Sequence, residues 1–148
     1  HQHQYERINL SDTEKVEEVG RRRNALEKQL RTVLRNALRF AYGNKARDKV
    51  IASLQESRRE KMMDHSLELL LSKDTSPLFF LDLVNIVNRE WEVVKNVFEM
   101  EKNRVVLMLE EINRIGRPDA HAKAIEKDDF DQLRLYFNKL EAVLGEWA

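Results

Sequence analysis

Apolar residues recur at steps of three and four along most of the chain, which is the spacing that places side chains on one face of an α-helix. The stripe is strongest in the stretch that begins at Leu78, where it marks a central core helix. The predicted helices cover residues 12–42, 50–62, 78–98, 105–112 and 128–144, and the second either continues or breaks before residues 67–71. We therefore expect an all-α fold, an up-and-down bundle of four to five helices.

Local signals mark the ends of the first helix and the start of the core helix. Ser11 followed by Glu14 is the pattern of a capping box, in which each side chain accepts a hydrogen bond from the other residue's backbone. Gly43 is a typical helix stop. Ser76 and Pro77 are expected as the N-cap and the first residue of the core helix, which places residues 73–77 in a turn.

The second half of the chain carries its own boundary signals. The apolar pattern breaks near residues 100–103, and either Asp128 or Asp129 is expected to cap the last helix, which ends at Gly145. Between the last two helices, Gly116 and Pro118 interrupt the helical pattern, because glycine relaxes the backbone and proline cannot donate the next hydrogen bond. The sequence therefore predicts a short, bent segment that joins two apolar helices.

Composition narrows the class of protein. With 148 residues, 42% of them hydrophobic, 4 glycines and 2 prolines, the chain suits one helical domain over residues 11–148, after an N-terminal extension, residues 1–10, with the character of an expression tag. Lysine plus arginine number 26, and so do aspartate plus glutamate. The chain therefore has no overall positive charge of the kind that would indicate nucleic-acid binding. There is no cysteine, and no apolar run is long enough for a membrane span. We expect a soluble cytoplasmic protein.

The bent segment contains the side chains that are the best candidates for catalysis. Its polar residues include two arginines and a histidine, Arg114, Arg117 and His121. Imidazole titrates near neutrality and can take the proton of a ribose 2′-hydroxyl as it attacks the neighbouring phosphate. An arginine can hold the phosphate oxygens and stabilise the charge that develops. By spacing alone, the same residues also suit a polar interhelical loop whose histidine caps a helix.

A family resemblance enters at this segment. It resembles the signature of the HEPN superfamily, the higher-eukaryote and prokaryote nucleotide-binding helical domains. The matching residues are Ile112, Asn113, Arg114, Ile115, Gly116, Arg117, Pro118, Asp119, Ala120 and His121. The resemblance implies a helical bundle, homodimers, and metal-independent endoribonuclease activity in bacterial antiviral defence or toxin systems, with RNA as substrate and no metal or cofactor.

The resemblance also implies roles for individual residues. In the family an arginine is followed by four to six residues and then a histidine, and six residues separate Arg114 from His121. His121 is then the general acid and base, Arg114 the first choice for the phosphate contact, and Arg117 the second. Asn113 would orient the segment or a 2′-hydroxyl, and Lys123 would be an auxiliary cation.

Two alternatives stay open. If the segment is aligned on its Asn-x-Ile and Ala-His anchors, Gly116 occupies the arginine's place, which is the pattern of an inactive HEPN domain kept as a dimerisation, partner-binding or nucleotide-binding module of a larger protein. Residues 21–23 form an arginine run, which we interpret as a solvated helix face; the alternative is a phosphate-binding patch on a structural or DNA-binding adaptor.

Overall fold

The computed structural model describes residues 10–117 and 124–147, and the regular structure in these ranges is entirely helical. The predicted all-α class is confirmed. The α-helices are α2 (Asp12–Tyr42), α3 (Ala46–Ser53), α4 (Glu56–Met62), α5 (Leu67–Leu70), α6 (Phe80–Arg89), α7 (Trp91–Phe98), α8 (Lys102–Gly116) and α9 (Lys127–Leu144), with a 3₁₀ turn, η1 (Gly43–Lys45), after α2. In the described part of the chain, no helix is both long enough and apolar enough to cross a membrane.

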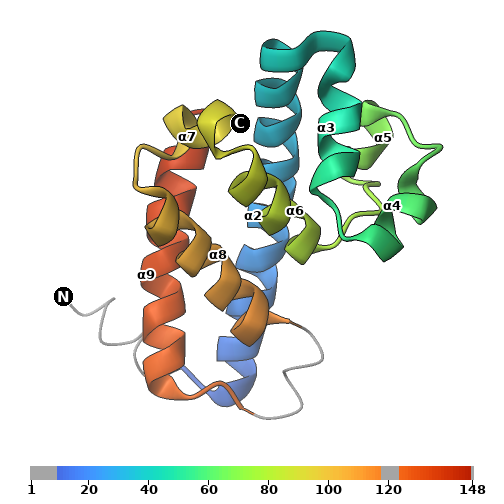
Figure 1. Cartoon of the computed structure of the whole chain (residues 1–148). Coiled ribbons are helices and arrows are strands. Elements are labelled where there is room, and N and C mark those ends of the chain that lie inside the picture. Colours follow the sequence, from blue (N-terminus) through green and yellow to red (C-terminus); the bar gives the residue numbers. More distant parts are fainter. Residues whose placement is uncertain (1–9, 118–123, 148) are drawn as a thin grey trace.

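The two longest helices, α2 and α9, lie side by side and run in the same direction (Figure 1). Glu18 of α2 faces Arg134 of α9 at 3.4 Å, and one turn further along, Arg22 donates hydrogen bonds to Asn138 and Glu141. Helix α8 runs back between them, and the short helices α3, α4 and α5 gather beside the C-terminal half of α2 (Figure 1). Helix α2 is therefore the element on which the other layers are built.

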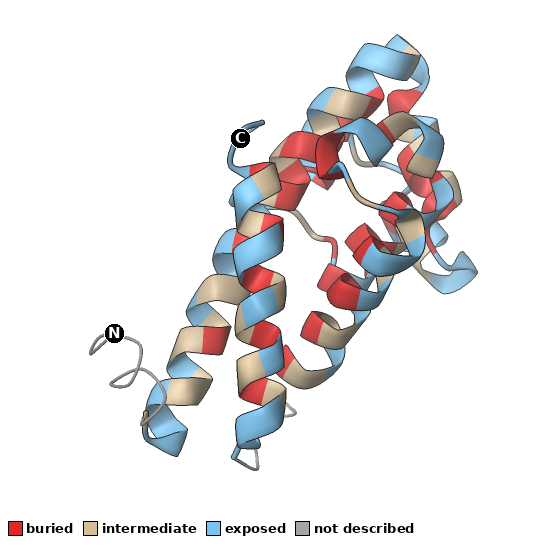
Figure 2. Ribbon diagram, turned by 90° about the vertical axis from the view of Figure 1, so that its left-hand side faces the viewer, coloured by how far each residue is buried: buried red, intermediate tan, exposed pale blue. Residues whose placement is uncertain are grey.

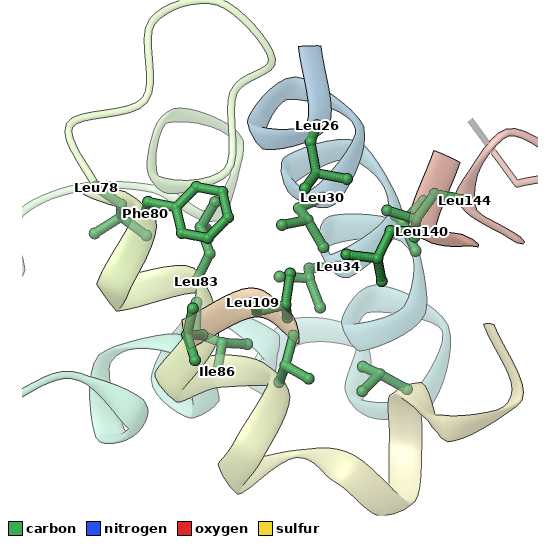
Figure 3. Packing of buried hydrophobic residues seen from close by; sticks show 14 of the residues in the cluster. Leu26, Leu30, Leu34, Leu78, Phe80, Leu83, Ile86, Leu109, Leu140 and Leu144 are labelled. Atoms are coloured by element: carbon green, nitrogen blue, oxygen red, sulfur yellow. The ribbon is translucent and has the colours of Figure 1, made fainter. Parts of the chain in front are cut away.

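The core forms where the apolar stripes of these helices face one another. Figure 2 shows the buried positions on the inner sides of the helices, with exposed positions on the outside. Leu26, Leu30 and Leu34 form a row along α2, between α6 on one side and α9 on the other (Figure 3). Each buried leucine or phenylalanine contributes about 1.5–3 kcal/mol to folding. The predicted helical periodicity thus accounts for which faces are buried.

Several predicted boundaries are confirmed because they depend on local chemistry. The backbone N–H of Glu14 donates to Ser11 Oγ, and that of Ser11 donates to Glu14 Oε1, both at 3.1 Å. Gly43 ends α2 with a positive φ of 55°, which a glycine adopts without strain. The break before α8 falls at Glu99, which has a left-handed conformation, and Gly145 caps α9.

Two predicted helices are each divided in the structure. The helix expected over residues 50–62 is interrupted at Leu54, whose extended backbone directs its carbonyl to Arg59 Nε at 2.8 Å. The core helix expected over residues 78–98 is interrupted at Glu90, whose buried carboxylate accepts a hydrogen bond from Tyr42 Oη at 2.5 Å. Both interruptions therefore involve bonds that the apolar spacing does not reveal.

Two predicted caps are wrong. Helix α6 begins at Phe80 rather than at Pro77, since the buried carboxylate of Asp82 accepts the backbone N–H of Phe79 at 2.8 Å and so supplies the cap. Ser76 instead bridges the preceding turn, where its hydroxyl donates to the carbonyl of Leu70. The last helix begins at Lys127 after an N-cap at Glu126. The aspartates at 128 and 129 lie in its first turn, where their negative charges interact favourably with the positive end of the helix dipole.

Candidate functional site

The end of α8 forms one wall of a pocket of about 630 Å³. The other walls are the N-terminal half of α2 and the start of α6. The lining residues are Arg23, Asn24, Glu27, Leu78, Phe79, Phe80, Leu81, Asn113 and Arg117. Volumes of this order suit small molecules and single nucleotides. The pocket brings together two of the predicted site residues, Asn113 and Arg117, with a third polar group from a distant part of the chain, Arg23.

Gly116 allows α8 to approach α2 at this pocket. A Cβ atom on Gly116 would lie 3.3 Å from Val19 Cγ1 and 3.3 Å from Arg23 Cδ, closer than most side-chain contacts. Helix α8 ends at Gly116, so the interruption that the sequence predicts at this point is confirmed. The extended backbone of Arg117, with φ −66° and ψ 141°, ends it, as the clash with a following proline, Pro118, requires.

Arg23 is held in the pocket wall by three described contacts. Its Nη2 donates to Asn113 Oδ1 at 3.2 Å, and its guanidinium carbon lies 4.8 Å from the centre of the Phe80 ring. Its Nη1 lies 3.7 Å from Glu27 Oε1. Only 12% of the side chain is exposed, so the cation is presented by a fixed group rather than by a flexible surface chain. Fixed cations are the ones that can position a phosphate.

One acidic residue, Glu27, tempers the positive charge of the pocket. Glu27 also accepts a hydrogen bond from Arg31, whose Nη1 donates to the backbone carbonyl of Lys73 at 3.0 Å. The carboxylate is therefore shared between two arginines of α2. With Arg117 at the end of α8, the lining side chains keep an excess of positive charge, which suits an anionic ligand.

The remaining wall is apolar and carries an exposed aromatic ring. Phe79, at the N-cap of α6, is 64% exposed, and Leu81 beside it is 40% exposed. The guanidinium of Arg58 covers one face of the Phe79 ring at 4.2 Å. Arg58 Nη2 is fixed in turn by the buried carboxylate of Asp82 at 2.9 Å and by the carbonyl of Pro77 at 3.1 Å. The ring is thus supported from behind while it remains open to solvent.

Arg114 lies outside this arrangement. Its Nε donates to Glu111 Oε2 at 2.7 Å, and the side chain is 66% exposed. The hydrogen bond to Glu111, together with the charges of Glu111 and Asp129, raises the pKa of the guanidinium. Arg114 is bound to Glu111 and is not among the residues that line the pocket, so it does not share the site of Asn113 and Arg117. His121 and Lys123 lie outside the described residues.

Of the arginine run at 21–23, two members are not the solvated face that the sequence predicts. Arg22 is 13% exposed, lies over the Phe137 ring, and makes a two-point contact with Glu141, at 3.0 and 2.7 Å. Arg23 lines the pocket and was missed as a site residue. The signal that could have found it is its position on the core stripe of Val19, Leu26 and Leu30, where a charged residue needs a partner.

Among the described residues, no group of three or more His, Asp or Glu side chains could share a metal ion. Neither a known protein family, nor a characterised protein, nor a solved structure gives a significant match to this chain.

Proposed function

We propose that the chain is a HEPN-type helical bundle domain that binds RNA and cleaves it without a metal ion. The single observation that carries this proposal is that Arg23, Asn113 and Arg117 line one pocket. In the sequence, Arg117 directly precedes the segment that contains His121. Two cations and an amide on one pocket suit a phosphodiester, whose oxygens accept hydrogen bonds from several donors at once.

The roles of the two arginines of the motif are reassigned in this proposal. Arg117 becomes the first choice for the phosphate contact, because it lines the pocket and Arg114 is bound to Glu111 elsewhere. Arg23 takes the second position, since α2 holds it against the same pocket. Asn113 fixes Arg23 rather than touching the 2′-hydroxyl, and Lys123 keeps its predicted role as an auxiliary cation.

The proposed reaction is an internal transesterification. His121 takes the proton from a ribose 2′-hydroxyl while the 2′-oxygen forms a bond to phosphorus. The bond from phosphorus to the 5′-oxygen of the next nucleotide breaks, and that oxygen leaves with a proton returned by the imidazolium. The products are a 2′,3′-cyclic phosphate and a 5′-hydroxyl. Arg117 and Arg23 stabilise the charge that builds on the non-bridging oxygens.

Cleavage of an end-labelled RNA in EDTA tests this proposal. We expect His121→Ala to abolish cleavage, and Arg117→Ala to reduce its rate roughly a hundredfold, the usual effect of losing one charge-stabilising donor. Arg114→Ala is the matched control, an arginine on the same helix, and should retain most of the activity. Retained cleavage in His121→Ala, or equal losses in the two arginine variants, would contradict the assignment.

A second candidate function, a homodimerisation module, is favoured by an apolar groove of about 630 Å³ between α2 and α7. Val33, Ala37, Val93, Val97 and Trp147 line it. Phe40 also lines the groove, and this residue is 95% exposed. A ring and a groove on one surface are self-complementary about a two-fold axis, which is how a symmetric dimer forms.

Sedimentation at micromolar concentration tests the dimer. Phe40→Ser should give monomers, whereas Leu135→Ser, a change at another exposed apolar residue, should leave the dimer intact. A monomeric wild-type chain, or a dimeric Phe40→Ser variant, would contradict this second function.

A further inference from the structure

We propose that Phe79 stacks on a base of the bound RNA and makes the pocket selective for unpaired nucleotides. The inference rests on the proposed function in taking RNA as the ligand, and it adds a binding element that the Arg-His motif does not contain. Its basis is the pairing, within one pocket, of an exposed aromatic ring, Phe79, with a fixed cation, Arg23.

The Phe79 ring has the properties of a stacking platform. It is 64% exposed although it belongs to the wall of a pocket, and burial within the protein therefore does not explain its position. Arg58 covers one face at 4.2 Å and leaves the other available. A cation behind the ring also holds its orientation, so a base would meet a surface that is already in place.

The platform is held rigidly by its surroundings. The Phe79 backbone N–H is bound to Asp82, and the same carboxylate, which is 5% exposed, binds Arg58. Phe80, the next residue, lies under the guanidinium of Arg23. The stacking ring belongs to Phe79, and the Arg23 cation of α2 packs on the ring of the next residue, Phe80, so the start of α6 sets the spacing between them.

The arrangement selects for single strands. A base that stacks on Phe79 while its phosphate reaches Arg23 or Arg117 must leave its own base stack, because bases in a duplex are covered on both faces. Stacking on an aromatic side chain tolerates every base, since each has a π-face. The pocket should thus prefer unpaired RNA with little preference for sequence.

The experiment measures affinity by fluorescence anisotropy with a labelled 2′-O-methyl RNA decamer, which cannot be cleaved because its 2′-oxygen is blocked. The set of probes adds the same decamer as a duplex and a decamer with abasic sites. We expect Phe79→Ala to weaken binding of the single strand roughly 5- to 150-fold, the range for losing one stacked base. Phe79→Trp should retain the affinity.

Leu135→Ala is the protein control, since Leu135 is 60% exposed and lies on α9, outside the pocket. The Phe79→Ala effect should vanish on the abasic decamer, which keeps the phosphates but has no base to stack. The duplex should bind more weakly than the single strand, by a factor that Phe79→Ala removes.

Equal losses on the intact and abasic decamers would overturn the stacking role and leave the proposed cleavage untouched. Base-dependent binding through Phe79 by a chain that cleaves no RNA would support the inference and contradict the proposed function. Displacement of the decamer by adenosine monophosphate at an equal concentration would assign the pocket to a free nucleotide and overturn the RNA ligand. Failure to bind any of these probes would overturn both proposals.

Discussion

Arg23 donates a hydrogen bond to Asn113 at 3.2 Å, across ninety residues of sequence. This bond joins the N-terminal half of α2 to the last turn of α8, and it aims a cation along the wall of the candidate pocket. An aspartate at 113 would keep the geometry and neutralise the cation. The pair is thus a point at which charge in the pocket can be changed without removing a contact.

We predict that Asn113→Asp lowers the affinity for single-stranded RNA about three- to tenfold at 0.1 M salt, because it removes the net charge of one phosphate contact. The slope of log Kd against log salt should fall by about 0.7. Asn138→Asp is the matched control, since Asn138 accepts a bond from Arg22 in the same way but outside the pocket. Equal effects of the two changes would refute the assignment.

The two helical glycines Gly20 and Gly116 should respond to alanine with opposite signs. A Cβ on Gly20 meets nothing within 4 Å. Gly20→Ala should therefore stabilise the fold by about 0.5–1 kcal/mol, because alanine lowers the conformational entropy of the unfolded chain. Gly116→Ala presses on buried Val19 and on Arg23, and overpacking should cost about 1 kcal/mol. Urea denaturation of both variants measures the difference, and a stabilising Gly116→Ala would show that α8 can shift.

Arg22→Lys should destabilise the fold by about 1 kcal/mol. Arg22 binds both oxygens of Glu141 and also Asn138, a planar contact that an ammonium cannot reproduce. Lys95→Met is the control, because the pair of Lys95 and Glu92 is solvent-exposed and should leave the urea midpoint unchanged. A lysine variant as stable as the wild type would contradict a structural role for the two-point contact.

The hydrogen bond between Tyr42 and Glu90 makes the free energy of unfolding depend on pH in the alkaline range. The hydrogen bond to Glu90 raises the pKa of Tyr42 above the ordinary phenol value of about 10. A folded-state pKa above the unfolded one means that the folded chain holds the proton more tightly. The bond therefore contributes fully below about pH 10, and the contribution is lost as pH rises through the raised pKa.

Tyr42→Phe should accordingly cost about 1 kcal/mol at pH 7, since it leaves the buried Glu90 carboxylate without this donor. The difference from wild type should shrink above pH 10. Urea midpoints of both proteins between pH 7 and 11 measure it, and a constant difference across that range would exclude the Tyr42 proton as the cause.

The predictable part of the fold is the part set by neighbouring residues. The caps at Ser11, Gly43 and Gly145 depend on groups within a few positions, and the helical stripes depend on spacing alone. The interruptions at Leu54 and Glu90 were missed because apolar periodicity does not encode the polar bonds made there. Arg59 binds the carbonyl of Leu54 from five residues away, and Tyr42 binds Glu90 from a distant part of the chain.

The candidate site was predictable to a similar degree. Asn113 and Arg117 lie in one short segment of the sequence, which is why both were predicted as site residues, and both line the pocket. The inclusion of Arg23 does not follow from any local signal, because its partner is ninety residues away. Its place on a leucine stripe indicates a buried or partnered cation, although not which pocket it faces.

The side-by-side packing of α2 with α9 has a consequence for protein synthesis. The contacts of Arg22 with Glu141 close a loop of 119 residues, so they cannot form until the ribosome has released almost all of this sequence. Until then the leucines of α2 lack the apolar face of α9, and a nascent chain that stalls before residue 127 leaves that side of α2 open to chaperones. Helix α2 thus leaves the ribosome long before α9, the neighbour on which one of its faces packs.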